Sequence, residues 1–142
     1  SERFGVPCST LDDYNRLCSD APLRRNVIVI DELAEITDTT GMDKPHKELA
    51  AAVVGKLATI ARLGRAVGFD LIIGVQRGDA NVVPGQIKSN ISGRVCGVAD
   101  DTLSRIILGN GDADTLIPKH GRGLFLNQDG VMFRGYLPDS AS

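Results

Sequence analysis

Two acidic side chains stand directly after a run of apolar, β-branched residues. Asp31 and Glu32 follow the letters VIVI at residues 27–30, and a helical pattern resumes after them. A carboxylate at the end of a buried strand can hold Mg²⁺, usually through water, and an adjacent carboxylate can orient and deprotonate a water that attacks a phosphate. The structural alternative is that Asp31 caps the following helix and Glu32 lies in its first turn.

A second polar site ends the next apolar segment, FDLIIGVQR at residues 69–77. The amide of Gln76 can hydrogen-bond a terminal phosphate or the attacking water, and so respond to hydrolysis. In open parallel α/β sheets, ligands lie beyond the carboxyl ends of the strands. Gln76 and Arg77 are therefore expected to share a cleft with the acidic pair. Taken alone, Gln76 would be interpreted as a solvated strand end.

The elements that must position these side chains are a strand, a helix and a second strand. Residues 26–30 (NVIVI) have the continuous apolar character of a strand covered on both faces. Apolar residues recur at three-to-four spacing from Lys47 to Val67, which predicts one long amphipathic helix, and Gly68 is its stop signal. With residues 69–77 as the second strand, this order predicts a βαβ unit.

The remaining segments predict an α/β fold with a mostly parallel sheet and a C-terminal antiparallel hairpin. Residues 1–25 are weakly specified, and LDDYNRL within them is compatible with a short helix. After the central strand we expect a loop at Thr37–Pro45, a helical turn at 85–91 and a third strand at 93–99. A helix at 100–108 should follow, capped by Asp100 or Asp101 and ended by Gly109 and Gly111. The chain should then form a hairpin at 122–137, whose inward-facing residues are Leu124, Leu126, Val131 and Phe133.

Composition sets the broad class of protein. The chain has 142 residues, of which 42% are hydrophobic and 24% charged, which is enough for one globular domain with a real core and too little for two. No apolar run approaches the roughly 18 residues of a membrane span, so a cytoplasmic protein is expected. Three cysteines without a CxxC pair suit a reducing compartment. A net charge of −2 neither favours nor excludes nucleic acid as a partner.

Several motifs occur together in one order: RRNVIVIDELAEI, ARLGRAVGFDLIIGVQR and GQIKSNISGRVCGVADDTLSRIILG. They resemble the second half of the motor domain of the FtsK/SpoIIIE family of DNA-translocating ATPases, over residues 25–135. In that family a Walker B strand ends in Asp-Glu, a later strand ends in Thr-Gln-Arg, and Asp-Ser-Arg begins a helix. Here Val75 replaces the Thr, and residues 101–105 only loosely replace Asp-Ser-Arg, which leaves the register of Arg105 open.

The resemblance implies a RecA-like P-loop NTPase core, with residues 26–136 as the motor core. It implies a ring, typically a hexamer, that uses ATP and Mg²⁺ to move double-stranded DNA in segregation or conjugative transfer. The family also includes secretion ATPases that move protein, and a membrane tether outside these residues is compatible with it. Asp31 would hold Mg²⁺, Glu32 would activate water and Gln76 would sense the terminal phosphate. Arg105 would complete the ATP site of a neighbouring subunit, or would only pair with Asp101.

One required motif is missing. No GxxxxGKS or GxxxxGKT sequence occurs in the 142 residues, so the loop that cradles phosphates is not part of this sequence. We therefore expect residues 1–142 to be one partial ATPase domain that lacks Walker A and is inactive alone; a noncatalytic interaction domain is the alternative. Lys44 and Lys47 are candidate DNA contacts, since phosphate contacts need only charge and reach, or are simply solvated.

Overall fold

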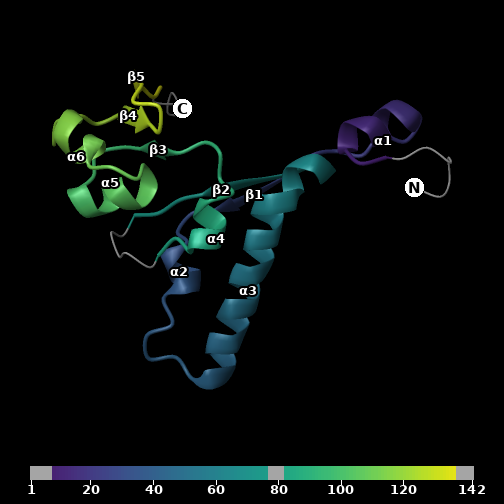
Figure 1. Ribbon diagram of the computed structural model, residues 1–142, viewed down its shortest axis with the longest axis horizontal. Helices are drawn as coiled ribbons and strands as arrows, with labels where there is room; N and C mark the ends of the chain where they lie inside the picture. The colour runs from purple at the N-terminus through teal and green to yellow at the C-terminus, as the bar shows by residue number, and fades with distance from the viewer. Residues whose placement is uncertain (1–7, 77–81, 137–142) are drawn as a thin grey trace, which may run out of the picture.

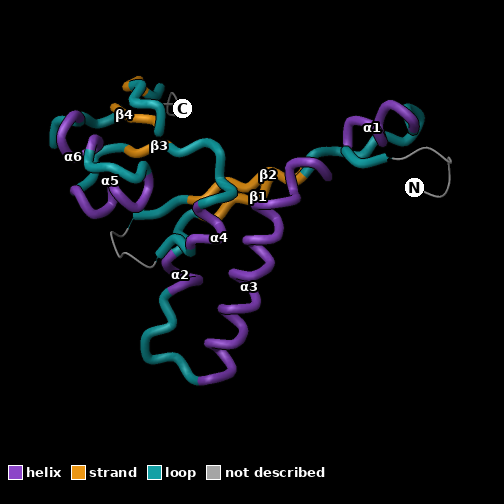
Figure 2. Tube along the Cα trace, viewed as in Figure 1, coloured by secondary structure: helices purple, strands orange, loops and turns teal. Residues whose placement is uncertain are grey.

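The computed structural model describes residues 8–76 and 82–136, so Arg77 lies outside the described residues. Figures 1 and 2 show the arrangement of the elements. In chain order they are α1 (Leu11–Leu17), β1 (Asn26–Ile30), α2 (Ala34–Thr37), α3 (Lys44–Leu63), the 3₁₀ helix η1 (Gly64–Val67), β2 (Phe69–Ile73), α4 (Gly85–Lys88), β3 (Val95–Cys96), α5 (Asp101–Ile107), α6 (Asp112–Leu116), β4 (Leu124–Asn127) and β5 (Met132–Arg134). None of the helices in these ranges is long and apolar enough to cross a membrane.

The predicted βαβ unit is present. β1 and β2 pair in parallel, from Asn26 opposite Phe69 to Ile30 opposite Ile73, and α3 connects them. Figure 2 shows α2, α3 and α4 on one side of the two strands. A core cluster forms there around Leu33, Leu57, Ala58 and Ile87. The amphipathic pattern of α3 supplies two of these residues, as the three-to-four spacing predicts.

The other face of β1 and β2 is open in the described chain. Val29 is 66% exposed and Ile72 is 56% exposed, and these two residues are register partners. The expectation of a strand covered on both faces is therefore wrong for this chain as described. A continuous apolar run indicates that both faces of a strand suit burial, but it does not indicate which element packs on each face.

Helix α3 begins earlier than the sequence predicts. Its N-cap is Asp43, whose side chain accepts a hydrogen bond from the backbone N–H of His46. Pro45 lies in the first turn, where a proline costs no hydrogen bond, so it is not the end of a loop. The α-helix ends at Leu63, earlier than predicted, and η1 continues it to Val67 as a 3₁₀ helix. Gly68, with φ of 82°, closes η1 in the left-handed conformation, at the predicted stop.

The prediction of a mostly parallel sheet is wrong for the described residues. β3 does not join β1 and β2; it pairs antiparallel with β4, with Cys96 opposite Leu126. β4 in turn pairs antiparallel with β5, so the C-terminal hairpin is confirmed. Cys96 and Leu126 belong to a second core cluster with Leu108, Ala113 and Ile117. β3 packs into this second core, and not beside β1 and β2, because burying Cys96 against β4 and the neighbouring helices removes apolar surface from water.

After Gly109 and Gly111, the chain enters a helix that the sequence pattern did not predict, α6, at Asp112. Ser104 is fully buried, and its Oγ donates to the carbonyl of Asn110 at 2.7 Å and accepts from the N–H of Ala113 at 3.0 Å. This hydroxyl therefore joins α5 to the start of α6. The N-cap of α5 is Asp100, which accepts from Leu103 N at 2.8 Å.

The hairpin faces were predicted only in part. Leu126 is buried and Leu124 is partly buried, as expected, but Val131 is 56% exposed and Phe133 is 42% exposed. Phe133 lies opposite Phe125, with ring centroids 5.7 Å apart. Val131 belongs to the turn, where its N–H donates to the side chain of Asn127. In the observed register Leu126 pairs with Met132 and Phe125 with Phe133, so Phe133 lies on the opposite face from Leu124 and Leu126.

Candidate functional site

The segments that follow β1 and β2 stay joined beyond the strand ladder. Gly74 N donates to the carbonyl of Ile30 at 2.7 Å, and Leu33 N donates to the carbonyl of Gly74 at 3.0 Å. A Cβ atom at position 74 would collide with the backbone carbonyl of Asp31. Glycine therefore permits the close approach that brings the two strand ends together. Gly74 was not among the predicted site residues, although a glycine inside an apolar strand pattern is the signal for such an approach.

Glu32 lies at the centre of this junction, partly buried. Its Oε1 accepts a hydrogen bond from Ala34 N at 3.0 Å, and its Oε2 accepts one from Gln76 N at 2.8 Å. Ala34 begins α2, where the backbone N–H has no acceptor within the helix. Glu32, and not Asp31, is thus the carboxylate that serves the start of α2. The structure brings Glu32 and Gln76 into direct contact through the backbone of Gln76.

Asp31 is exposed beside this junction, and the described part of the chain offers its carboxylate no hydrogen-bond or ion-pair partner. The same residues contain no group of three or more His, Cys, Asp or Glu side chains that could hold a metal ion. Mg²⁺ commonly takes one or two carboxylates from the protein and its other ligands from water and substrate phosphates. Asp31 therefore fits a magnesium ion that arrives with a nucleotide, and does not fit a metal site made by the protein alone.

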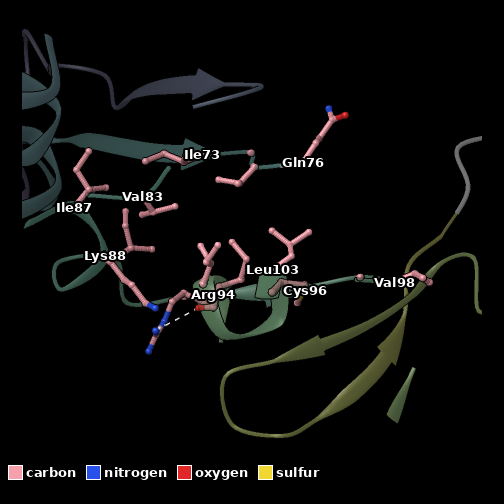
Figure 3. A pocket seen from close by; sticks show the side chains of 17 residues that line it. Ile73, Gln76, Val83, Ile87, Lys88, Arg94, Cys96, Val98 and Leu103 are labelled. Atoms are coloured by element: carbon pink, nitrogen blue, oxygen red, sulfur yellow. Dashed lines mark hydrogen bonds between the residues drawn. The ribbon is translucent and has the colours of Figure 1, made fainter. Parts of the chain in front are cut away.

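A cavity of about 460 Å³ lies next to Gln76, between the end of β2, α4, β3 and α5. Figure 3 shows the side chain of Gln76 pointing away from the apolar side chains that line this cavity, such as Val83 and Leu103. Gln76 is exposed, so its amide is accessible while its backbone is held by Glu32. The cavity wall also contains Cys96, where burial raises the pKa of the thiol.

Two cations at the cavity hold the end of α5. Lys88 Nζ donates to the carbonyl of Arg105 at 3.1 Å, and Arg94 Nη1 donates to the carbonyl of Ile107 at 3.3 Å. Both carbonyls lie in the last turn of α5. The carbonyl of Arg105 also accepts a hydrogen bond from Gly109 N at 3.1 Å, so Lys88 gives it a further donor. Arg94 Nε is buried without a hydrogen-bond partner among the described residues. The sequence gives no signal for either cation, because each contact joins separate segments of the chain.

Arg105 makes the local ion pair that the sequence allows. Its Nε donates to Asp101 Oδ2 at 2.8 Å, four residues earlier on α5, and both side chains are more than half exposed. This hydrogen bond lowers the pKa of Asp101 and raises the pKa of Arg105. Within the described residues no contact joins Arg105 to the strand-end residues Asp31, Glu32 and Gln76.

Lys44 and Lys47 lie in the first turns of α3. Both are exposed, and Lys44 Nζ lies 3.8 Å from Glu48 Oε1. Figure 1 shows this N-terminal end of α3 far from β1 and β2, which lie near the other end of the helix. The adjacent N-cap, Asp43, has its pKa lowered by hydrogen bonds from the side chain and backbone of His46. The structure therefore does not bring the two lysines to the strand-end site.

Comparison with known proteins gives one consistent group of relatives. No protein-family model matches the chain. It is 33% identical over 132 residues to the DNA translocase FtsK of Chlorobaculum tepidum, covering 92% of this chain and 15% of that protein. It is 36% identical over 117 residues to FtsK of Halalkalibacterium halodurans, covering 82% of this chain and 12% of that protein. The chain thus spans only a small part of the length of these curated relatives.

Two solved structures are also similar. The pCW3 conjugation coupling protein TcpA, in a monomer form with ATPγS, matches with a TM-score of 0.81 and 41% identity, over 88% of this chain and 36% of that one. The cytoplasmic domain of the Thermomonospora curvata type VII secretion ATPase EccC matches with a TM-score of 0.68 and 22% identity, over 99% of this chain and 16% of that one. The second likeness shows the fold alone.

Proposed function

The chain is part of an FtsK/SpoIIIE-type ATPase domain, and from this premise we propose that it serves a motor that hydrolyses ATP to move double-stranded DNA. The observation that carries the proposal is the junction of the two strand ends. It holds an acidic pair and an amide side chain together at the carboxyl edge of a parallel strand pair, where ligands of such sheets bind.

Each strand-end residue has a distinct role in this proposal. Asp31 would hold Mg²⁺, which when bound stabilises the negative charge of the transferred phosphoryl group. Glu32 would orient and deprotonate the attacking water. A carboxylate has about four lone-pair positions, and the bonds from Ala34 N and Gln76 N leave acceptor capacity for a water. The exposed amide of Gln76 would contact the terminal phosphate.

In this proposal the phosphate-binding loop comes from a segment outside the given 142 residues, because these contain no Walker A motif. We place this segment at the cavity beside Gln76. Consecutive residues 73–76 border one side of the cavity and residues 93–98 the other, and within the described chain β2 and β3 each have an unpaired edge there. An added strand would satisfy backbone groups on both edges.

DNA is the proposed substrate because the more similar relatives are named for it. The two curated relatives named above are DNA translocases, and TcpA, a conjugation coupling protein, is 41% identical, whereas the secretion ATPase EccC is 22% identical. We further propose a cytoplasmic ring, typically a hexamer, in which Lys44 and Lys47 contact the DNA backbone and Arg105 reaches the ATP site of the neighbouring subunit. Two alternatives remain: a secretion-type ATPase that moves protein, and a noncatalytic domain that only binds other proteins.

The test is ATPase activity of a longer polypeptide that includes the phosphate-binding segment. We expect duplex DNA to stimulate the activity, and rising salt to remove the stimulation, because binding to phosphates releases counterions. Activity that responds to an unfolded or secreted protein and not to DNA would support the secretion alternative. A well-folded polypeptide that binds no nucleotide would support the interaction domain. The 142-residue chain alone is expected to show no turnover.

A further inference from the structure

Glu32 makes a hydrogen bond that water activation does not require. Its Oε2 accepts from the backbone N–H of Gln76 at 2.8 Å, across a separation of 44 positions in the chain. A residue that only removes a proton from water gains nothing by holding the amide of the neighbouring segment. The other oxygen binds Ala34 N at the start of α2, so one carboxylate connects three segments.

The backbone of Gln76 depends on this bond. β2 ends at Ile73, and the backbone bonds that continue its pairing with the β1 segment reach only Gly74. Within residues 8–76 and 82–136, Glu32 is the group that binds the N–H of Gln76. Because Gln76 is exposed, water would otherwise compete for this N–H.

We propose that Glu32 is a positioning residue for Gln76, in addition to any part it takes in proton transfer. Its carboxylate fixes the peptide of Gln76 against the end of β1, and so fixes the point from which the Gln76 side chain reaches a phosphate. The role of Gln76 rests on the proposed function, but the bond itself does not. A shift of Gln76 that lengthens the contact beyond about 3.5 Å breaks the bond and releases Oε2.

The chemistry of the two oxygens makes this role testable by substitution. Glu32→Gln keeps one acceptor oxygen and replaces the other with an NH₂ group, which donates and does not accept. Either Ala34 or Gln76 then loses its acceptor. Glu32→Ala removes both acceptors, whereas Gln76→Ala removes a side chain but keeps the backbone N–H at position 76. These variants separate the bond from the side chain it positions.

The experiment is nuclear magnetic resonance of the labelled 142-residue chain without nucleotide. We expect a coupling through the hydrogen bond between the amide ¹⁵N of Gln76 and the carboxyl ¹³C of Glu32. We also expect the amide hydrogen of residue 76 to exchange at least about tenfold faster in Glu32→Ala, since hydrogen bonds to charged groups are stronger than average. Gln76→Ala is the matched control, and its amide at position 76 should keep its protection.

Two neighbouring amides report on the integrity of the strand ends. Leu33 N and Gly74 N bind backbone carbonyls and not Glu32, so they should stay protected in Glu32→Ala. Equal exchange of the residue 76 amide in the parent chain and Glu32→Ala would overturn the proposal. So would equal loss of protection at Leu33 and Gly74, because Glu32 would then support the fold in general.

If Glu32→Ala does not fold, Glu32→Gln provides the comparison, and full protection of both Ala34 and Gln76 in that variant would overturn the proposal. The result is independent of catalysis. A longer polypeptide without ATPase activity would contradict the proposed function, while an intact coupling between Glu32 and Gln76 would still support the positioning role.

Discussion

The strand-end site and the exposed cations of the helices are built in opposite ways. Glu32 is partly buried and binds backbone groups of two other segments, and the residue that follows it, Leu33, is fully buried in the first core cluster. Lys44 and Arg105 are largely exposed, and their ion pairs are with residues four positions away on the same helix. Acid–base chemistry requires atoms at fixed positions, whereas contact with a phosphate backbone or a neighbouring subunit requires charge and reach.

This difference predicts how the two regions respond to substitution. Exposed ion pairs contribute little to folding, so changes at the helix cations should alter binding or activity without altering stability. Changes at the strand ends should alter both, because the same contacts hold the backbone and the side chains. The following variants test that separation.

The largest effect is expected at Glu32. In a longer polypeptide with the phosphate-binding segment, Glu32→Gln should lower ATP hydrolysis by roughly a hundredfold or more, because an amide does not accept the proton, while nucleotide binding persists. Asp31→Asn should instead weaken Mg²⁺-dependent nucleotide binding. Steady-state ATPase and nucleotide-binding measurements distinguish the two. Equal loss of affinity in both variants, with Glu32→Gln still turning over, would show that the roles are wrongly assigned.

Gly74 tests whether the strand ends need their close approach. Gly74→Ala places a methyl group against the carbonyl of Asp31, and we expect a loss of about 1–3 kcal/mol in the free energy of unfolding. Gly85→Ala is the matched control, since an added Cβ there meets no atom within 4 Å. Urea unfolding of the 142-residue chain measures both. If the two variants have the same stability, the junction is looser than the structure indicates.

Arg105 tests whether an exposed cation acts across a subunit boundary. Arg105→Ala in the longer polypeptide should lower ATPase activity by about tenfold or more, because a guanidinium stabilises charge on the transferred phosphoryl group. Mixing it with Glu32→Gln subunits should restore part of the activity, since mixed rings contain interfaces with both residues intact. Asp101→Asn is the control, because it weakens the local pair and keeps Arg105. Full activity of Arg105→Ala by itself would refute the role.

The smallest effect is expected at the N-terminal end of α3. Substituting both Lys44 and Lys47 with Ala should weaken duplex DNA binding several-fold. It should also reduce the slope of the logarithm of the binding constant against the logarithm of salt concentration by about 1 to 2, because each phosphate contact contributes roughly 0.9 to this slope. Stability should stay within about 0.5 kcal/mol of the parent chain. Lys56→Ala, at an exposed position farther along α3, is the control. An unchanged salt slope in the double variant would exclude these lysines from the DNA interface.

The sequence predicted the elements that local patterns encode. The β-branched run predicted β1, three-to-four spacing predicted α3, and Gly68 marked the end of η1, which continues α3, because each signal depends on residues within a few positions of one another. The start of α3 was placed too late because Pro45 was assigned to a loop. The short helix α6 was missed, since its start depends on the buried Ser104 hydroxyl nine positions before Ala113.

The sequence by itself determined the residue types at the two strand ends, the βαβ unit and the hairpin. Only the tertiary structure decided that β3 pairs with β4, which faces of the hairpin are buried, and that Glu32 binds the N–H of Gln76 across 44 positions. Periodicity records which side of an element is apolar, but strand pairing depends on which unpaired edges meet when the cores form. A hydrogen bond between distant segments depends further on the close approach that Gly74 allows. The glycine is visible in the strand pattern, but the segment that approaches it is not.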